Sequence, residues 1–236
     1  MLPKLTSPMF NITIPSTGNS VKIRPMLVKE EKILLVAKQS EDQTDILTAM
    51  KQVVNNCLID LDSDTLTLFD LEYVFLRIRG VSISNVLKMS YKDSEDDKVY
   101  DFTIDLDKDV TIKTDQVKPS TIEFTNEENK FAITLKYPPA TLYDDKGFLQ
   151  LDSDHVFEGL MFKCLDKITM NDIPLEVESE DDFKQWLDQL SVEVYTQAGD
   201  YFKNLPTLYC ELKYTNTNNN ERKIVLTSLQ DFFSFR

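Results

Sequence analysis

Three short acidic segments contain the residue types that could bind a metal ion or perform acid–base chemistry. DLDSD (60–64) and DLDKD (105–109) both place aspartates at the first, third and fifth positions, as in a calcium-binding loop. Such a loop also needs glycine at its sixth position and glutamate at its twelfth. The first segment has Thr65 and Leu71 at these positions, and the second also lacks both. The spacing therefore predicts acidic surface loops and no calcium site.

The third segment, DSDHV, contains His155, the chain's only histidine, close to Asp152 and Asp154. Catalytic zinc sites usually take two or three imidazoles, and no G-x-S-x-G motif supports a Ser-His-Asp triad. The glycine-rich loops that bind phosphates are also missing from the sequence. We predict that the protein is not an enzyme and takes no cofactor, metal or small-molecule substrate. An Asp-dependent metallohydrolase built on the three acidic segments is the weaker alternative.

Composition narrows the class of protein further. The 236 residues are 42% hydrophobic, which suffices for a folded core. They carry 26 lysines and arginines against 40 aspartates and glutamates, a net charge of −14. This acidic balance argues against nucleic-acid binding and suits basic partners. The opening MLPKLTSP lacks the apolar core of a signal peptide, and no apolar run approaches the ~20 residues of a membrane span.

The cysteines indicate the redox environment. Cys57, Cys164 and Cys210 are odd in number and far apart, without a Cys-x-x-Cys pair. This usage predicts buried thiols in a reducing cytoplasm, and neither a disulfide framework nor a zinc site.

The elements that position these residues follow from periodicity, which predicts an α+β fold with helical N- and C-terminal parts and a β-hairpin-rich middle section. Alternating segments predict strands at 10–14, 21–25, 85–91, 99–106, 109–113, 121–125, 131–137, 207–215 and 222–227. Apolar residues at helical spacing predict helices at 28–38, 42–56, 67–80, 153–168, 179–191 and through Val194 and Tyr201.

Three parts of the chain are expected from these elements. Residues 1–84 form an N-terminal hairpin with helices, residues 85–138 a β-rich middle, and residues 139–236 C-terminal helices with a hairpin. Pro138 marks the clearest boundary, because two prolines follow a strand there. The three parts are either separate or one compact unit.

The helix expected at 67–80 is apolar on nearly all sides, so it is buried among other elements or covered by a partner. Thr67 is expected to start it with a capping box, and Gly80 to end it in the left-handed conformation. Arg77 and Arg79 fall in the last turn. They either complement the helix dipole or bind a partner protein.

The final segment, SLQDFFSFR, is unusually apolar for a chain end. Phe232, Phe233 and Phe235 either dock on the protein's own core or form a patch that another protein covers. The strands before the segment favour docking, because they return the chain to the fold. Together with the two arginines, these phenylalanines are the candidate partner-binding residues.

Four segments resemble a known family in matching order and spacing. They are IPSTGNSVKIRPMLVKEEKILLVAKQS, TLFDLEYVFLRIRGVSISN, FAITLKYPP and TSLQDFFSF, and they resemble the baseplate hub assembly proteins of T-even-type contractile-tailed bacteriophages. In some relatives the hairpin written here as YKDSEDDKVYDF carries cysteines. This chain has Asp93, Ser94 and Asp97 there, so the resemblance implies no metal.

The resemblance implies a non-enzymatic assembly factor that contacts other phage baseplate hub proteins and binds no nucleic acid, membrane or small molecule. Its expected location is the host cell cytoplasm during assembly, or the tail baseplate of the virion. The alternative is a permanent structural subunit of the baseplate hub.

Overall fold

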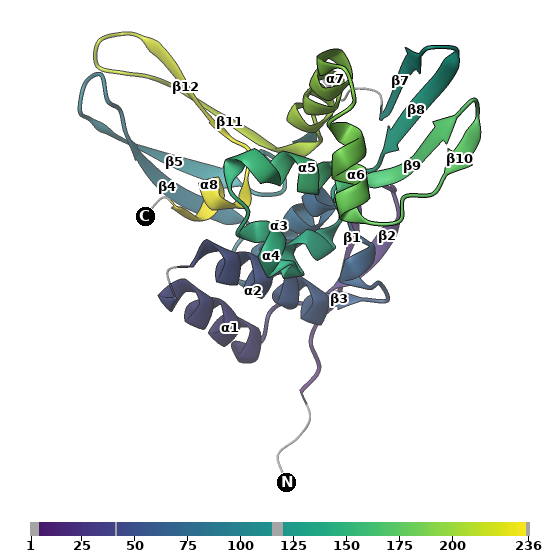
Figure 1. The fold of residues 1–236 in the computed structure, drawn as a ribbon. Helices are drawn as coiled ribbons and strands as arrows, with labels where there is room; N and C mark the ends of the chain where they lie inside the picture. The colour runs from purple at the N-terminus through teal and green to yellow at the C-terminus, as the bar shows by residue number, and fades with distance from the viewer. Residues whose placement is uncertain (1–4, 41, 115–119, 235–236) are drawn as a thin grey trace. The chain divides into compact units, whose positions relative to one another are not determined.

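The computed structural model describes residues 5–40, 42–114 and 120–234. The chain divides into two units, one formed by Met1–Lys113 with Thr207–Arg236 and the other by Thr114–Pro206. The first unit is thus built from both ends of the chain. Helices and strands occur in both units, which confirms the predicted α+β class (Figure 1). The three-part division at residues 84 and 138 stays a prediction.

The first unit combines helices with small antiparallel sheets. Its helices are α1 (Val28–Gln39), α2 (Gln43–Cys57), α3 (Leu68–Ser82) and α8 (Leu229–Ser234), with a 3-10 turn η1 (Ser63–Thr65). Its sheets have the strand orders β1-β2-β3, β4-β5 and β12-β11-β6. The strands are β1 (Phe10–Thr13), β2 (Ser20–Ile23), β3 (Leu58–Ile59), β4 (Val86–Lys92), β5 (Val99–Asp105), β6 (Thr111–Lys113), β11 (Thr207–Thr215) and β12 (Glu221–Leu226).

Helix α3 supplies much of the core of the first unit. Thr67 accepts a hydrogen bond from the backbone N–H of Asp70, whose carboxylate accepts one from the backbone N–H of Thr67, which confirms the predicted capping box. Val74 and Ile78 are fully buried, and α3 packs against α2, β1 and β11. The apolar surface of this helix is therefore explained by burial within its own unit.

The predicted end of α3 at Gly80 is wrong. The helix continues to Ser82, and Gly18 is the only glycine with a positive φ in the described part of the chain. A Cβ atom at Gly80 would collide with the side-chain oxygen of Asn85. The glycine therefore allows a close approach between helix and side chain, and it does not terminate the helix.

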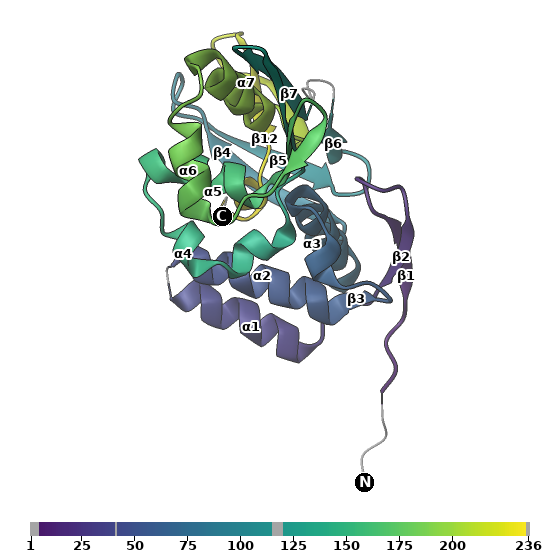
Figure 2. The ribbon, with the colours of Figure 1, turned by 45° about the vertical axis from the view of Figure 1, so that its right-hand side comes forward.

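A buried ion pair fixes the start of α1. The Glu30 carboxylate, with no exposed surface, accepts hydrogen bonds from Arg24 Nη2 at 3.0 Å and from the backbone N–H of Leu27 at 2.7 Å. Arg24 also donates to the carbonyl of Asn56 at 2.7 Å, near the end of α2. These bonds hold the first turn of α1 against the last turn of α2, and Figure 2 shows the two helices lying side by side.

The second unit is a four-stranded antiparallel sheet with helices. The sheet order is β10-β9-β8-β7, formed by β7 (Thr121–Asn126), β8 (Asn129–Leu135), β9 (Leu165–Met170) and β10 (Ile173–Leu175). The helices are α4 (Lys146–Leu149), α5 (Ser153–Lys163), α6 (Glu180–Leu187) and α7 (Val192–Lys203), with a 3-10 turn η2 (Ala140–Asp144). Ile133, Met161, Phe183, Ala198 and Tyr201 are central to its core.

The helix predicted at 153–168 is too long. It ends at Lys163, and the following residues form β9, in which Ile168 pairs with Ile133 of β8. Asn171 and Asp172 both have positive φ, 51° and 66°, and connect β9 to β10 in a two-residue hairpin turn. Pairing with β8 therefore overrides the helical pattern of the sequence at this point.

Candidate functional site

The acidic segments serve as caps and ion-pair partners in the structure. In DLDSD, Asp62 caps η1 and Asp64 forms a 2.6 Å ion pair with Lys51. In DLDKD, Asp109 accepts a 2.7 Å hydrogen bond from the backbone N–H of Asp105. Across residues 5–40, 42–114 and 120–234, no group of three or more histidine, cysteine or acidic side chains is placed to hold a metal ion.

His155 lies in the first turn of α5, where it contacts the helix cap. Its Nδ1 atom is 2.5 Å from Asp152 Oδ1, and that carboxylate also accepts the backbone N–H of His155. Both side chains are more than half exposed. This arrangement is an N-terminal cap.

Arg77 and Asp107 connect helix α3 with the acidic segment DLDKD. Arg77 Nη1 forms an ion pair with Asp107 of DLDKD, and its guanidinium lies 5.8 Å from the ring centre of Tyr73. Asn85 Nδ2 also donates to Asp107, at 2.5 Å. Arg77 thus fastens the turn after β5 to α3.

Arg79 and Phe232 meet in an apolar groove of the first unit. The groove has a volume of about 490 Å³. Its apolar lining residues come from α1, α2, α3, β4, α8 and adjoining segments, and they are Met26, Leu34, Leu35, Ala37, Ile46, Leu47, Met50, Phe75, Ile83, Leu87, Leu229 and Phe232. Two of the five candidate residues therefore contribute to one site, which we call the α1–α8 groove.

The final helix forms one wall of the α1–α8 groove. The Asp231 carboxylate accepts hydrogen bonds from the backbone N–H groups of Thr227 and Ser228, at 2.8 and 2.9 Å, which start α8. Leu229 and Phe232 are each only 2% exposed. Phe232 is therefore docked on the core of its own unit. The Phe233 side chain and Phe235 lie outside the described residues.

Four charged residues complete the groove, and three of them are cations: Lys38, Arg79 and Lys88, with Glu31 as the one carboxylate. Burial lowers the pKa of Arg79, and the carboxylate of Glu31 opposes this effect. The groove is thus a locally positive site on a chain whose net charge is −14.

Part of the groove lining is exposed apolar surface. Leu35 on α1 is 52% exposed, and Ile83 at the end of α3 is 63% exposed. Val28 and Val36 are also exposed on α1, but they lie outside the groove lining. Exposed apolar side chains in the lining of a groove are typical of protein–protein interaction sites.

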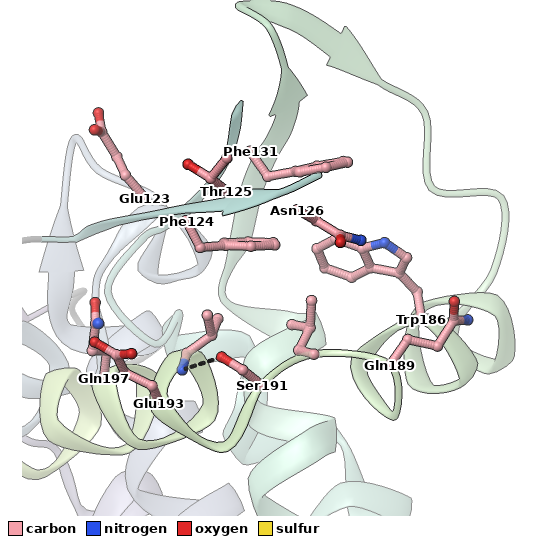
Figure 3. A pocket seen from close by; sticks show the side chains of 12 residues that line it. Glu123, Phe124, Thr125, Asn126, Phe131, Trp186, Gln189, Ser191, Glu193 and Gln197 are labelled. Atoms are coloured by element: carbon pink, nitrogen blue, oxygen red, sulfur yellow. Dashed lines mark hydrogen bonds between the residues drawn. The ribbon is translucent and has the colours of Figure 1, made fainter. Parts of the chain in front are cut away.

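A second pocket, of about 480 Å³, lies in the second unit (Figure 3). Phe124 and Phe131, paired across β7 and β8, stack with ring centres 5.3 Å apart, and Trp186 of α6 lies 6.3 Å from Phe124. The backbone N–H of Val194 donates to Ser191 and caps α7 beside the pocket. The sequence placed Trp186 in the helix predicted at 179–191 but did not reveal this pocket, because the pocket forms only when β7 lies opposite α6.

The three cysteines are buried free thiols, as predicted. Burial raises the pKa of Cys57 and of Cys210 to about 11, and the pKa of Cys164 to about 12. All three thiols are therefore protonated near neutral pH, and none has the character of a catalytic nucleophile.

Comparison with known proteins identifies the family. Among the described helices, none has the length and apolar character needed to cross a membrane. Neither the curated proteins nor the solved structures gave a significant match. A family model described as T4 bacteriophage base plate protein matches residues 7–234, nearly the whole chain. The chain therefore belongs to the T4 bacteriophage base plate protein family.

Proposed function

We propose that this protein is a non-enzymatic assembly factor of the baseplate hub, and that it acts through protein–protein contacts at the α1–α8 groove. Membership in a base plate family supports a structural or assembly role in the phage baseplate, with other baseplate proteins as partners. The observation that carries the finer proposal is the groove itself, which combines apolar walls, exposed Leu35 and Ile83, and a cationic rim.

The groove fits an amphipathic helix of another baseplate protein. Such a helix places apolar residues at i, i+3, i+4 and i+7 into a groove of this kind. Acidic residues beside that apolar stripe would face Lys38, Arg79 and Lys88, and opposite charges at the rim favour encounter and correct register. The buried Arg24–Glu30 pair keeps α1 in place before the partner arrives, so little free energy is spent on ordering the site.

A permanent structural subunit of the hub is the second candidate, because the same groove would serve a lasting contact. The two roles differ in whether the protein remains in the virion. An assembly factor acts in the host cytoplasm and leaves, whereas a subunit is present in the tail baseplate at fixed copy number. Binding to nucleic acid, membrane or a small-molecule substrate is not part of either proposal.

Two measurements test the proposal together. Affinity-tagged protein is isolated from infected cells, and purified virions are analysed by quantitative mass spectrometry. The proposal expects co-isolation of another baseplate protein, with few or no copies of the tagged chain in virions. Stoichiometric copies in virions would select the subunit role, and isolation of the chain without any baseplate protein would refute both.

A further inference from the structure

The pocket of the second unit differs from a core cavity in its walls. The rings of Phe124, Phe131 and Trp186 are only partly buried. The rest of the lining is mixed: it includes polar Gln189, Ser191 and Gln197 together with apolar Leu190 and Val194 (Figure 3). Partly exposed aromatic rings in a pocket provide a surface on which a flat or cationic group can stack.

One carboxylate residue lines the pocket beside these rings. Glu193, in the first turn of α7, is exposed and belongs to the pocket lining. Glu123 of β7 also borders the pocket, but its side chain points to the other face of the strand from Phe124, where it lies 3.0 Å from Lys130 (Figure 3). A carboxylate beside aromatic rings favours a cation, and a guanidinium suits this site better than an ammonium because it stacks on the rings and donates hydrogen bonds from a planar fork.

The outer edge of β7 lies beside the same pocket. Among the described residues, β7 pairs only with β8. The backbone N–H of Leu135 donates to Ser120 at 2.8 Å, whereas Lys130 exchanges hydrogen bonds with Asn171 on the β9 side. In an antiparallel ladder this alternation directs the backbone groups of Glu123 and Thr125 away from β8. An extended segment could therefore pair along this edge and place alternate side chains in the pocket.

We propose that this pocket binds an arginine side chain of an extended segment from a partner protein, with the segment added to the outer edge of β7. The guanidinium stacks on Trp186 and Phe124 and pairs with Glu193. The net charge of −14 favours approach of such a basic segment. The site lies wholly within the second unit, so the proposal does not depend on the proposed role of the α1–α8 groove.

Trp186 makes the proposal directly measurable, because it is the only tryptophan of the chain. The full-length protein is titrated with a capped Thr-Val-Arg-Val-Thr peptide while the tryptophan emission is recorded. The matched probe carries citrulline in place of arginine, which keeps the shape and removes the charge. We expect a saturable change with the arginine peptide and about fivefold to tenfold weaker binding of the citrulline peptide.

Two variants localise the charge. Glu193→Gln should weaken binding of the arginine peptide about threefold, as expected for a partly exposed ion pair. Glu128→Gln, an exposed glutamate in the turn of the same hairpin and outside the pocket lining, should leave the affinity unchanged. Both carboxylates are exposed, so neither change threatens folding.

Amide hydrogen exchange tests the strand pairing separately. Peptide binding should slow exchange at Glu123 and Thr125, whose N–H groups face outward, more than at Phe124, which pairs with Phe131. Equal affinity for the arginine and citrulline peptides would overturn the proposal. So would the lack of a saturable signal at about 10 mM peptide, tenfold above a Kd of about 1 mM, or unchanged exchange at both outward amides in the bound protein.

Discussion

The Tyr214 hydroxyl donates a 2.7 Å hydrogen bond to the Asp93 carboxylate, 121 positions earlier in the chain. Asp93 has no exposed surface, and it also accepts the backbone N–H of Glu95 at 2.8 Å. Asn216 donates a 2.8 Å hydrogen bond to the Glu95 carboxylate, which is also 121 positions earlier in the chain. These bonds join the tip of the β4–β5 hairpin to the tip of the β11–β12 hairpin, which Figure 1 shows running alongside it.

Removing the Tyr214 hydroxyl should destabilise the protein in a pH-dependent way. The backbone N–H of Glu95 and the Tyr214 hydroxyl hold the pKa of Asp93 below its usual value. A lowered folded-state pKa gives stability that is present above the unfolded pKa of about 4 and is lost as pH falls through the folded value. Tyr214→Phe should therefore lower the urea midpoint at pH 7, and the difference from wild type should shrink below about pH 4.

Tyr195→Phe is the matched control for this change, because Tyr195 is 40% exposed on α7 of the other unit. It should leave the urea midpoint nearly unchanged at both pH values. A Tyr214→Phe deficit that stayed constant from pH 7 to pH 3 would contradict the assignment to the Asp93 carboxylate.

The Arg77–Asp107 pair should contribute modestly to stability. Both side chains are partly exposed, so the coupling free energy from a double-mutant cycle of Arg77→Ala and Asp107→Asn should be about 0.5–1 kcal/mol. Because the arginine is engaged within its own unit, Arg77→Ala should still support tail assembly. A variant that folds normally and fails in assembly would assign Arg77 to partner binding.

Truncating Phe232 should be costly. Its side chain is 2% exposed, and deleting a buried phenylalanine typically costs 3–5 kcal/mol in the free energy of unfolding. Phe10→Ala, at a site that is 39% exposed on β1, should cost less than about 1 kcal/mol. Equal unfolding midpoints for the two variants would mean that α8 does not dock in solution.

Chelators should leave the protein unaffected. The described residues place no three potential ligands together, and the acidic segments serve as caps and ion-pair partners. Thermal unfolding with and without EDTA should give the same midpoint, and elemental analysis should find no stoichiometric zinc. A drop of several degrees with EDTA would revive the metallohydrolase alternative, because a structural metal adds directly to folding free energy.

Local signals in the sequence were sufficient for much of the fold. The capping box at Thr67, the strand alternation and the apolar stripe of α2 all depend on neighbouring residues, and these elements appear where they were predicted. The strand at Leu165–Met170 was missed because it is selected by pairing with β8. Its one local signal was the Asn171–Asp172 turn, a known preference of two-residue hairpins.

The sites were less predictable than the elements. Arg77 and Arg79 look equivalent in the sequence, but one pairs with Asp107 and the other lines the α1–α8 groove. This difference arises because the groove is assembled from segments more than 190 positions apart, such as Leu35 and Phe232. Spacing along one helix could not reveal it.

Two neighbouring residues of α1 test the partner-binding role of the α1–α8 groove most directly. Leu35 and Val36 are both exposed aliphatic residues, at 52% and 68%, but only Leu35 lines the groove. Leu35→Asp and Val36→Asp should unfold at nearly the same urea concentration, because an exposed substitution changes stability by only about 0.5 kcal/mol. Each variant is then supplied in trans to a phage that lacks the functional gene, and complete tails are counted. We expect Val36→Asp to restore tails and Leu35→Asp to fail, whereas equal restoration by both variants would contradict a partner-binding role for the α1–α8 groove.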